Sequence, residues 1–202
     1  MAGEITHGIR GDEARLNALL GWTREHIRQI PPGWPIMDDH ILYTIIRGYG
    51  VDEQQADVFV TLSSYARTPA FWAAVKPRPG VPERLILTFT QWRGRWTVWD
   101  VSRGIAFHKK DGTPATVSDL TADLSAVEPD VLKWKQQGRP YREYLQHGLP
   151  QFFVPPILRA QKQMPLLRLG FELRCLWARL THRCYNGREL DPLVIFGEGG
   201  ER

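Results

Sequence analysis

Gly48-Tyr49-Gly50-Val51-Asp52-Glu53-Gln54-Gln55-Ala56-Asp57 is the stretch that decides the fold, because it joins a glycine-rich turn to the start of a helix. That helix is predicted from Asp52 to Ala66. Its apolar residues, concentrated between Val58 and Leu62, lie on more than one helical face, so we expect the helix to be deeply buried.

The residues that follow this helix predict an antiparallel hairpin. Pro69 ends the helix, and three prolines between residues 77 and 82 mark a loop. Leu85 to Trp92 and Trp96 to Val101 then alternate as strands, with Arg93-Gly94 as the turn between them. The fold class that we predict is therefore α+β, with a buried helix packed on a small antiparallel sheet.

Helices are also predicted on the N-terminal side of the glycine-rich turn. Asp12 to Ile30 has apolar residues roughly on one face, and the proline-rich segment from Pro31 to Pro35 ends it. His40 to Arg47 is predicted as a second helix, with Asp38 or Asp39 as its N-cap and Gly48 at its end.

The last third of the chain predicts a helical extension. A short helix, Asp119 to Ala126, is followed by predicted helices from Pro129 to Gln146 and from Ile157 to Leu180, and the tail after Arg183 reads as irregular. We therefore expect a domain of residues 1–128 with N-terminal helices, and a C-terminal helical extension of residues 129–202 packed on it.

Composition sets broad limits on function. The 202 residues are 43% hydrophobic and 24% charged, which suits one globular domain with an extension. No apolar run reaches signal-peptide or membrane-spanning length, so we expect a cytoplasmic protein in which Cys175 and Cys184 are free thiols. The net charge of +4 reads as spread along the chain, which argues against nucleic acid as a partner.

The order of turn, buried helix and hairpin resembles the core of the transglutaminase-like superfamily of papain-like cysteine enzymes, over roughly residues 41–124. In that family a cysteine begins the helix, a histidine lies on the next strand and an aspartate on the strand after it. The helix N-terminus favours the thiolate, the imidazole takes the proton, and the aspartate orients the imidazole.

Carried over residue by residue, the resemblance gives a degenerate site. The cysteine position falls on Asp52, and the histidine position falls within Arg84 to Leu87, where no histidine stands. The aspartate position falls on Asp100, preceded by Trp96 at the family's spacing. His108 is the nearest candidate for a displaced base.

Two interpretations of Asp52 stay open from the sequence. Asp52 and Gln55 fit a capping box, in which Asp52 is the N-cap of the helix. Alternatively, Asp52 and Asp100, joined by Glu53, form a rebuilt carboxylate site that acts as acid and base or holds a metal. We favour the first interpretation and expect no cofactor and no metal.

The function that the resemblance implies is binding without catalysis. We expect an inactive accessory subunit for a protein or peptide partner, in the style of bacterial proteins associated with exopolysaccharide or secondary-metabolite assembly. The partner-binding candidates are Tyr49, Glu53, Gln54, Trp96 and Trp99. The alternative is an enzyme for hydrolysis or for acyl or amide transfer. Peripheral membrane contact through Ile157 to Leu180 is a less favoured alternative to its packing on the domain.

Overall fold

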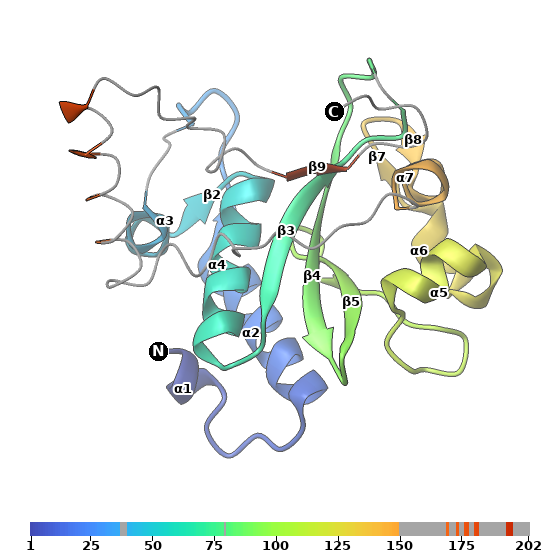
Figure 1. The fold of residues 1–202 in the computed structure, drawn as a ribbon, viewed down its shortest axis with the longest axis horizontal. Helices are drawn as coiled ribbons and strands as arrows, with labels where there is room; N and C mark the ends of the chain where they lie inside the picture. Colours follow the sequence, from blue (N-terminus) through green and yellow to red (C-terminus); the bar gives the residue numbers. More distant parts are fainter. Residues whose placement is uncertain are drawn as a thin grey trace.

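An antiparallel sheet stands between two groups of helices (Figure 1). The computed structural model describes residues 1–36, 40–78 and 80–149, and beyond them Leu169, Leu173, Leu176, Trp177, Leu180, Thr181 and residues 193–195. Among these residues no helix combines the length and the apolar character that crossing a bilayer requires.

Four antiparallel strands make up most of the sheet, in the order β6-β5-β4-β3: β3 (Ala70–Val75), β4 (Leu85–Trp92), β5 (Arg95–Asp100) and β6 (Ile105–Ala106). The short strand β9 (Leu193–Ile195) pairs in parallel with the outer edge of β3. The predicted α+β class is confirmed, whereas the prediction of an irregular tail is wrong at residues 193–195.

The predicted hairpin is confirmed. Strands β4 and β5 pair antiparallel from Thr88 opposite Trp99 to Trp92 opposite Arg95. Arg93 and Gly94 both have positive φ, at 48° and 78°, as a type I′ turn requires. The turn therefore has the twist that joins two antiparallel strands without a bulge.

Strand β3 is an element that the sequence reasoning missed. All six of its residues are buried, so the segment lacks the alternation of apolar and polar residues that marks a half-exposed strand. Phe71 faces one side of the sheet, where it packs with Phe89, while Trp72 faces the other side. Burial on both faces hides a strand from pattern-based prediction.

One face of the sheet is covered by α2 (Asp12–His26) and α4 (Asp52–Tyr65). Leu19, Phe59 and Trp99 are among the buried residues of the cluster between them. Asp57, the last residue of the decisive stretch, accepts a hydrogen bond from Nε1 of Trp72 at 2.5 Å and so attaches α4 to β3. The predicted burial of this helix is confirmed.

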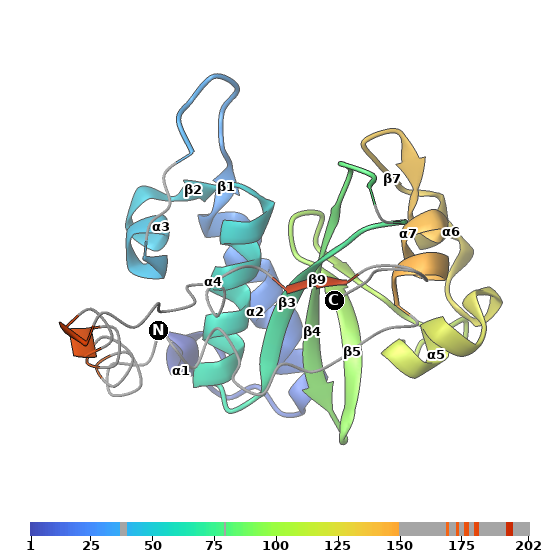
Figure 2. The same ribbon diagram turned by 45° about the horizontal axis from the view of Figure 1, so that its top comes forward.

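Shorter elements surround α2 and α4. They are α1 (Ala2–Ile5), α3 (Ile41–Arg47) and a parallel pair of two-residue strands, β1 (Arg28–Gln29) and β2 (Tyr49–Gly50). The pair β1–β2 lies beside the start of α4, and α1 lies near its other end (Figure 2). Helix α2 ends before β1, four residues earlier than predicted. The N-cap of α3 is His40, whose Nδ1 accepts from the Leu42 amide at 3.2 Å, whereas Asp38 and Asp39 lie outside the described residues.

The other face is covered by α5 (Val117–Ala122), a 3₁₀ turn (Leu124–Ala126), α6 (Pro129–Lys133) and α7 (Tyr141–Gly148). Tyr141, Tyr144 and Leu145 belong to the same buried cluster as Leu85 and Leu87 of β4. Helices on both sides of residue 128 thus pack in one core, and the division into two units there stays a prediction.

The predicted single helix from Pro129 to Gln146 is wrong. Between α6 and α7 the chain forms a hairpin of β7 (Lys135–Gln136) and β8 (Arg139–Pro140). Gln137 and Gly138 both have positive φ, and Pro140 ends the hairpin immediately before α7. Glycine and proline here mark a tight turn, which interrupts the helical pattern.

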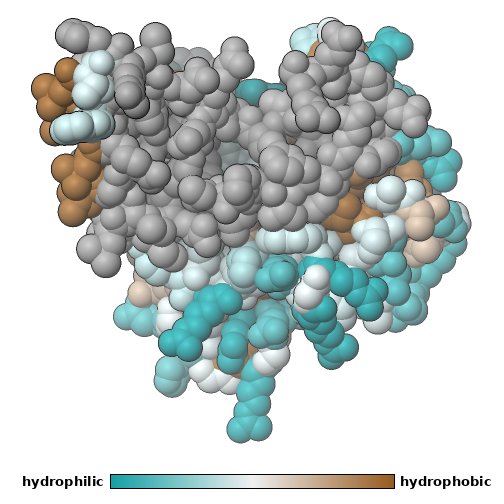
Figure 3. All heavy atoms as spheres, viewed as in Figure 1, coloured by the Kyte–Doolittle hydropathy of each residue, from teal (hydrophilic) through white to brown (hydrophobic). Residues whose placement is uncertain are grey.

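Most of the predicted helix Ile157–Leu180, together with Cys175 and Cys184, lies outside the described residues. The described members Leu169, Leu173, Leu176, Trp177 and Leu180 are helical, and each is more than half exposed. Apolar side chains on this side of the molecule are visible at the left edge of Figure 3. The alternatives of packing and membrane contact for this segment stay predictions.

Candidate functional site

The candidate site lies at one end of the sheet, where α4 and β4 begin and β5 ends. Gly48 ends α3 in the left-handed conformation, with φ of 74°. A Cβ atom built on Gly50 would lie 2.9 Å from both Cβ and Oε1 of Gln54, so only glycine fits at this position. Gly48 therefore lets the chain turn after α3, and Gly50 lets its backbone pack closely against Gln54 in the first turn of α4.

The predicted capping box of Asp52 and Gln55 is wrong. Val51 is the N-cap residue, and its amide donates to Oε1 of Gln54 at 3.1 Å, which is the reciprocal half of a capping box. Asp52 is the first helical residue. Gln55 instead donates from Nε2 to the carbonyl of Ile27 at 2.9 Å, which ties α4 to the segment after α2. Asp52 is therefore free of a capping role.

Asp100 is completely buried, and both of its carboxylate oxygens are occupied by donors. Oδ1 accepts from the Ser102 hydroxyl at 2.8 Å and from the Arg103 amide at 3.1 Å. Oδ2 accepts from the Arg103 guanidinium at 3.2 Å and from the Tyr141 hydroxyl in a short hydrogen bond. The carboxylate thus holds the turn after β5 and joins it to α7.

Arg103 and Tyr141 extend this network into the C-terminal part of the domain. The second guanidinium nitrogen of Arg103 donates to Oε1 of Gln136, and its Cζ lies 5.5 Å from the ring centre of Tyr141. Burial and the nearby Asp100 carboxylate raise the pKa of the Tyr141 phenol, so it stays protonated and donates. Sequence reasoning missed both residues, although Asp100, Ser102 and Arg103 form a local turn motif that is a recognisable signal.

Asp52 is partly exposed at the same end of the sheet. Burial raises the pKa of its carboxyl group, and the negative charge of Asp100 adds to this effect. The Arg103 guanidinium and a hydrogen bond from Gln29 act in the opposite direction. The structure therefore brings Asp52 into the electrostatic field of Asp100, with Arg103 as the cation for both.

Glu53 is engaged in a short ion pair with Arg84, the residue that precedes β4. The backbone of Arg84 is also held, because its amide donates to Gln137 at 3.3 Å and its carbonyl accepts from Gln136 at 3.4 Å. Arg84 lies within the expected histidine range, and it connects α4 to the β7–β8 hairpin. The Glu53 carboxylate therefore has a structural partner, Arg84.

The remaining residues of the expected histidine range are apolar and buried. Leu85 and Leu87 belong to the core cluster on the Tyr141 side of the sheet, and Ile86 belongs to the cluster that faces α4. His108 lies elsewhere: its Nε2 is 3.2 Å from Oε1 of Glu13 on α2. Neither this range nor His108 supplies a base beside Asp52.

The two tryptophans predicted to bind a partner belong to the packing of the sheet. Trp99 is 2% exposed, and its Nε1 donates to the hydroxyl of Thr90 at 2.8 Å. Trp96 packs edge-on against Phe71, with ring centres 5.0 Å apart. It lies four residues before Asp100 on β5, about 13 Å along an extended strand. Core packing accounts for both side chains.

Tyr49 lines a pocket of about 430 Å³. The ring of Trp34 meets Tyr49 edge-on at 5.1 Å, and the Arg47 guanidinium lies 5.0 Å from the Tyr49 ring centre. Arg28 and Gln29 also line this pocket. Gln29 hydrogen-bonds to Asp52 and thus connects the pocket to that carboxyl group. Gln54 is turned to the helix start, where it accepts from Val51.

Within the described part of the chain, no group of three or more histidine, cysteine, aspartate or glutamate side chains could hold a metal ion. Asp52, Glu53 and Asp100 do not form such a group. The Glu53 carboxylate pairs with Arg84, and the Asp100 carboxylate pairs with Arg103. The site offers the partly exposed carboxyl group of Asp52 and a nearby pocket lined by aromatic side chains, two arginines and Glu25.

Comparison with known proteins gives one distant structural similarity. No family model matches the chain, and no curated protein matches it either. The structure is similar to that of a protein described as a "putative cysteine protease" from Cytophaga hutchinsonii, with 19% sequence identity and a TM-score of 0.44. The match covers 63% of this chain and 43% of that protein, so the chain spans less than half of its length.

Proposed function

We propose that the protein is a binding module on a transglutaminase-like scaffold, without the thiol chemistry of that family. The observation that carries the proposal is the state of Asp100. In the family resemblance this aspartate orients a histidine, but here its four hydrogen bonds come from Ser102, Arg103 and Tyr141. An acid that is fully occupied by the fold has no capacity left to orient a base.

The groups at the other two catalytic positions support the same conclusion. Asp52 replaces a thiol by a carboxyl group, which cannot form the thioester of the cysteine enzymes. Leu85 and Leu87, on the face of the sheet that carries Asp100, have no ionisable atom. A nucleophile and a base would both have to be rebuilt before acyl transfer could proceed.

The pocket beside Tyr49 gives the bound partner a chemical character. Trp34 is 53% exposed and offers an aromatic surface, while Arg28 and Arg47 line the same pocket together with one acidic residue, Glu25, so positive charge is in excess. Aromatic and arginine side chains dominate the energetics of protein recognition sites. The partner that we propose is a peptide segment with acidic and aromatic side chains, seated in the pocket lined by Trp34, Tyr49 and Arg28.

This proposal is tested by selecting random dodecapeptides on the immobilised protein and measuring their affinity by fluorescence polarisation. Selected peptides should be enriched in acidic and aromatic residues, and Trp34→Ala should weaken them about tenfold, as expected for a contact of moderate energy. Trp134→Ala is the matched control, because Trp134 is similarly exposed, at 48%, on the opposite side of the sheet. Peptides that bind wild type and Trp34→Ala equally would overturn the proposal.

A second function is favoured by the raised pKa of Asp52. A carboxyl group whose pKa is raised by burial and a like charge is a candidate acid or base, so a hydrolase or an acyl or amide transferase with Asp52 as its acid remains the alternative. We expect no turnover of glutamine-containing peptides or esters by wild type. Turnover that is present in wild type and lost in a folded Asp52→Asn variant would establish the enzyme instead.

The biological setting follows from the resemblance only. A role beside exopolysaccharide or secondary-metabolite enzymes stays a prediction, as does the identity of the protein that carries the peptide segment. The acidic and aromatic character of the selected peptides would be the first direct evidence of the partner.

A further inference from the structure

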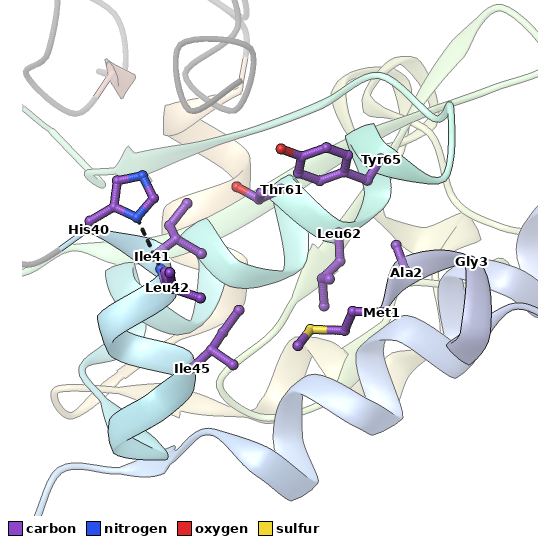
Figure 4. Close-up of a pocket in the computed structure, with 10 residues that line it drawn as sticks. All are labelled: Met1, Ala2, Gly3, His40, Ile41, Leu42, Ile45, Thr61, Leu62 and Tyr65. Atoms are coloured by element: carbon purple, nitrogen blue, oxygen red, sulfur yellow. Dashed lines mark hydrogen bonds between the residues drawn. The ribbon is translucent and has the colours of Figure 1, made fainter. Parts of the chain in front are cut away.

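A second pocket, of about 630 Å³, lies between α1, the start of α3 and the C-terminal half of α4 (Figure 4). Of the α4 residues that line it, Thr61 is the nearest to Asp52, and it lies nine residues further along, which is about 14 Å along the helix axis. The volume lies in the range of small-molecule sites in proteins. This pocket is therefore separate from the candidate site at the other end of α4.

Most of the pocket wall is apolar. Ile41, Leu42 and Ile45 of α3 face Leu62 of α4 and the side chains of Met1 and Ala2 across the pocket (Figure 4). Among the described residues, no aspartate, glutamate, lysine or arginine side chain lines it. The amino group of Met1 is 2.7 Å from the Glu4 carboxylate, so its charge is already paired. A wall of this kind favours an apolar, uncharged ligand.

Three polar side chains gather at one side of the pocket. Figure 4 shows the Thr61 hydroxyl between the imidazole of His40 and the phenol of Tyr65. Nδ1 of His40 accepts from the Leu42 amide, which leaves Nε2 as the nitrogen that can meet a ligand. The pocket is thus amphipathic, with hydrogen-bonding groups on one side and hydrocarbon on the other.

Thr61 is the informative residue because, of the three buried hydroxyls of α4 without a partner among the described residues, at Thr61, Ser63 and Ser64, only that of Thr61 belongs to a residue that lines the pocket. The residue is 7% exposed, and Oγ1 has no hydrogen-bond partner in the described part of the chain. Two other helical threonines bond to the carbonyl four residues earlier: Thr23 bonds to Leu19 and Thr121 to Val117, both at 2.8 Å. An unpaired buried hydroxyl is costly, and a ligand atom that bonds to it would recover that energy.

We propose that this pocket binds a hydrocarbon chain or ring that carries one uncharged oxygen head group, such as an alcohol or an ester. The apolar part would contact Ile45 and Leu62, and the oxygen would bond to Thr61. This site is independent of the proposed peptide site, and either proposal can fail without the other.

The probe is 1-octanol, with sodium octanoate as its charged counterpart, titrated into the ¹⁵N-labelled protein and followed by the amide shifts of Ile41, Ile45 and Leu62. We expect saturable shifts with 1-octanol and weaker binding of octanoate, because no cationic side chain among the described wall residues compensates a desolvated carboxylate. The absence of saturable shifts at these residues, or tighter binding of octanoate, would overturn the proposal.

Two variants separate pocket binding from non-specific contact. Ile45→Trp should fill the pocket and lower the octanol affinity at least tenfold, which corresponds to about 1.4 kcal/mol. Ile46→Trp is the matched control, because Ile46 is the next residue of α3, is 72% exposed and does not line the pocket. Equal loss of affinity in both variants would contradict the assignment of the site.

Thr61→Val tests the role of the hydroxyl. The change keeps the shape of the side chain and removes the unpaired oxygen, so the octanol affinity should fall about fivefold, the value of one ordinary hydrogen bond of about 1 kcal/mol. The ligand-free variant should melt at a higher temperature than wild type. An unchanged octanol affinity would show that the hydroxyl takes no part in binding.

Discussion

Asp100 illustrates how a single carboxylate can serve the fold where a related sequence pattern points to catalysis. From the sequence it had no evident structural partner. In the structure it receives donors from the turn that follows β5 and from Tyr141, forty-one residues further along the chain. Hydrogen bonds to a buried charge contribute more than those between neutral groups, so this residue links the sheet to α7.

Tyr141→Phe should destabilise the protein by about 1.5–3 kcal/mol, the usual range for a hydrogen bond to a charged group. The change leaves the ring and its packing in place and removes a donor from the buried Asp100 carboxylate. Urea unfolding measures the difference. Tyr43→Phe is the control, since the Tyr43 side chain is 61% exposed, and it should have little effect. Equal stability of the two variants would contradict the role assigned to Asp100.

Asp52→Asn should raise the stability at neutral pH. Because the pKa of Asp52 is higher in the folded state than in the unfolded chain, the folded protein holds this proton more tightly. Stability therefore falls as the pH rises from the model-peptide value, about 3.8, through the folded pKa. The advantage of Asp52→Asn should appear above that window and vanish below it, in thermal melts across pH 3 to 8. A lower melting temperature at pH 7 would instead indicate a capping role.

At the scale of the secondary-structure element, the start of α4 depends on close contact between the glycine-rich turn and the first turn of the helix. Gly50 lies against Gln54, whose side chain accepts from the Val51 amide. The conformation of this turn thus supports the helix N-terminus.

Gly50→Ala should destabilise the protein by about 1–3 kcal/mol, the range for overpacking of a tight site, because the new methyl group would meet Gln54 at 2.9 Å. Gly21→Ala in α2 is the matched control, since a Cβ atom at this position would have no described atom within 4 Å beyond its own helix and chain neighbours. That change should stabilise the protein by about 0.5–1 kcal/mol, as expected in a helix interior. Denaturant midpoints of the two variants should move in opposite directions, and a parallel shift would contradict the close contact at Gly50.

At the scale of the whole molecule, the sheet depends on segments from both ends of the chain. Helices α2 and α4 cover one face, and α5, α6 and α7 cover the other, while β9 pairs with the outer edge of β3. Strand β3 is apolar and buried over its full length. If β9 did not cover its edge, the unpaired backbone groups of β3 would favour self-association of the protein.

Removal of residues 189–202 should therefore lower the urea midpoint and promote self-association, because it deletes β9 and exposes the backbone hydrogen-bonding groups of β3. Size-exclusion chromatography with light scattering measures the association, and circular dichroism follows unfolding. A truncated protein that is as stable and as monomeric as the full chain would show that the pairing of β9 contributes nothing measurable.

The sequence by itself determined the elements that local chemistry specifies. Arg93-Gly94 predicted the hairpin because both positions need positive φ, and the apolar run from Val58 to Leu62 predicted a buried helix. Gly48 and Gly50 likewise marked the turn before α4. These signals depend on backbone sterics and side-chain periodicity over a few residues, so they can be read without a structure.

The tertiary structure alone decided the chemical state of the site. The spacing between Asp52 and Gln55 predicted that Asp52 caps the helix. In the structure Gln55 donates to the carbonyl of Ile27, and Gln54 accepts from the amide of Val51, the actual N-cap. Asp100 is joined to α7 through Tyr141, a contact that no local pattern shows, and β3 escaped detection because both of its faces are buried. Contacts between residues far apart in the chain leave no local pattern, and such contacts set which carboxylates are satisfied and which remain exposed.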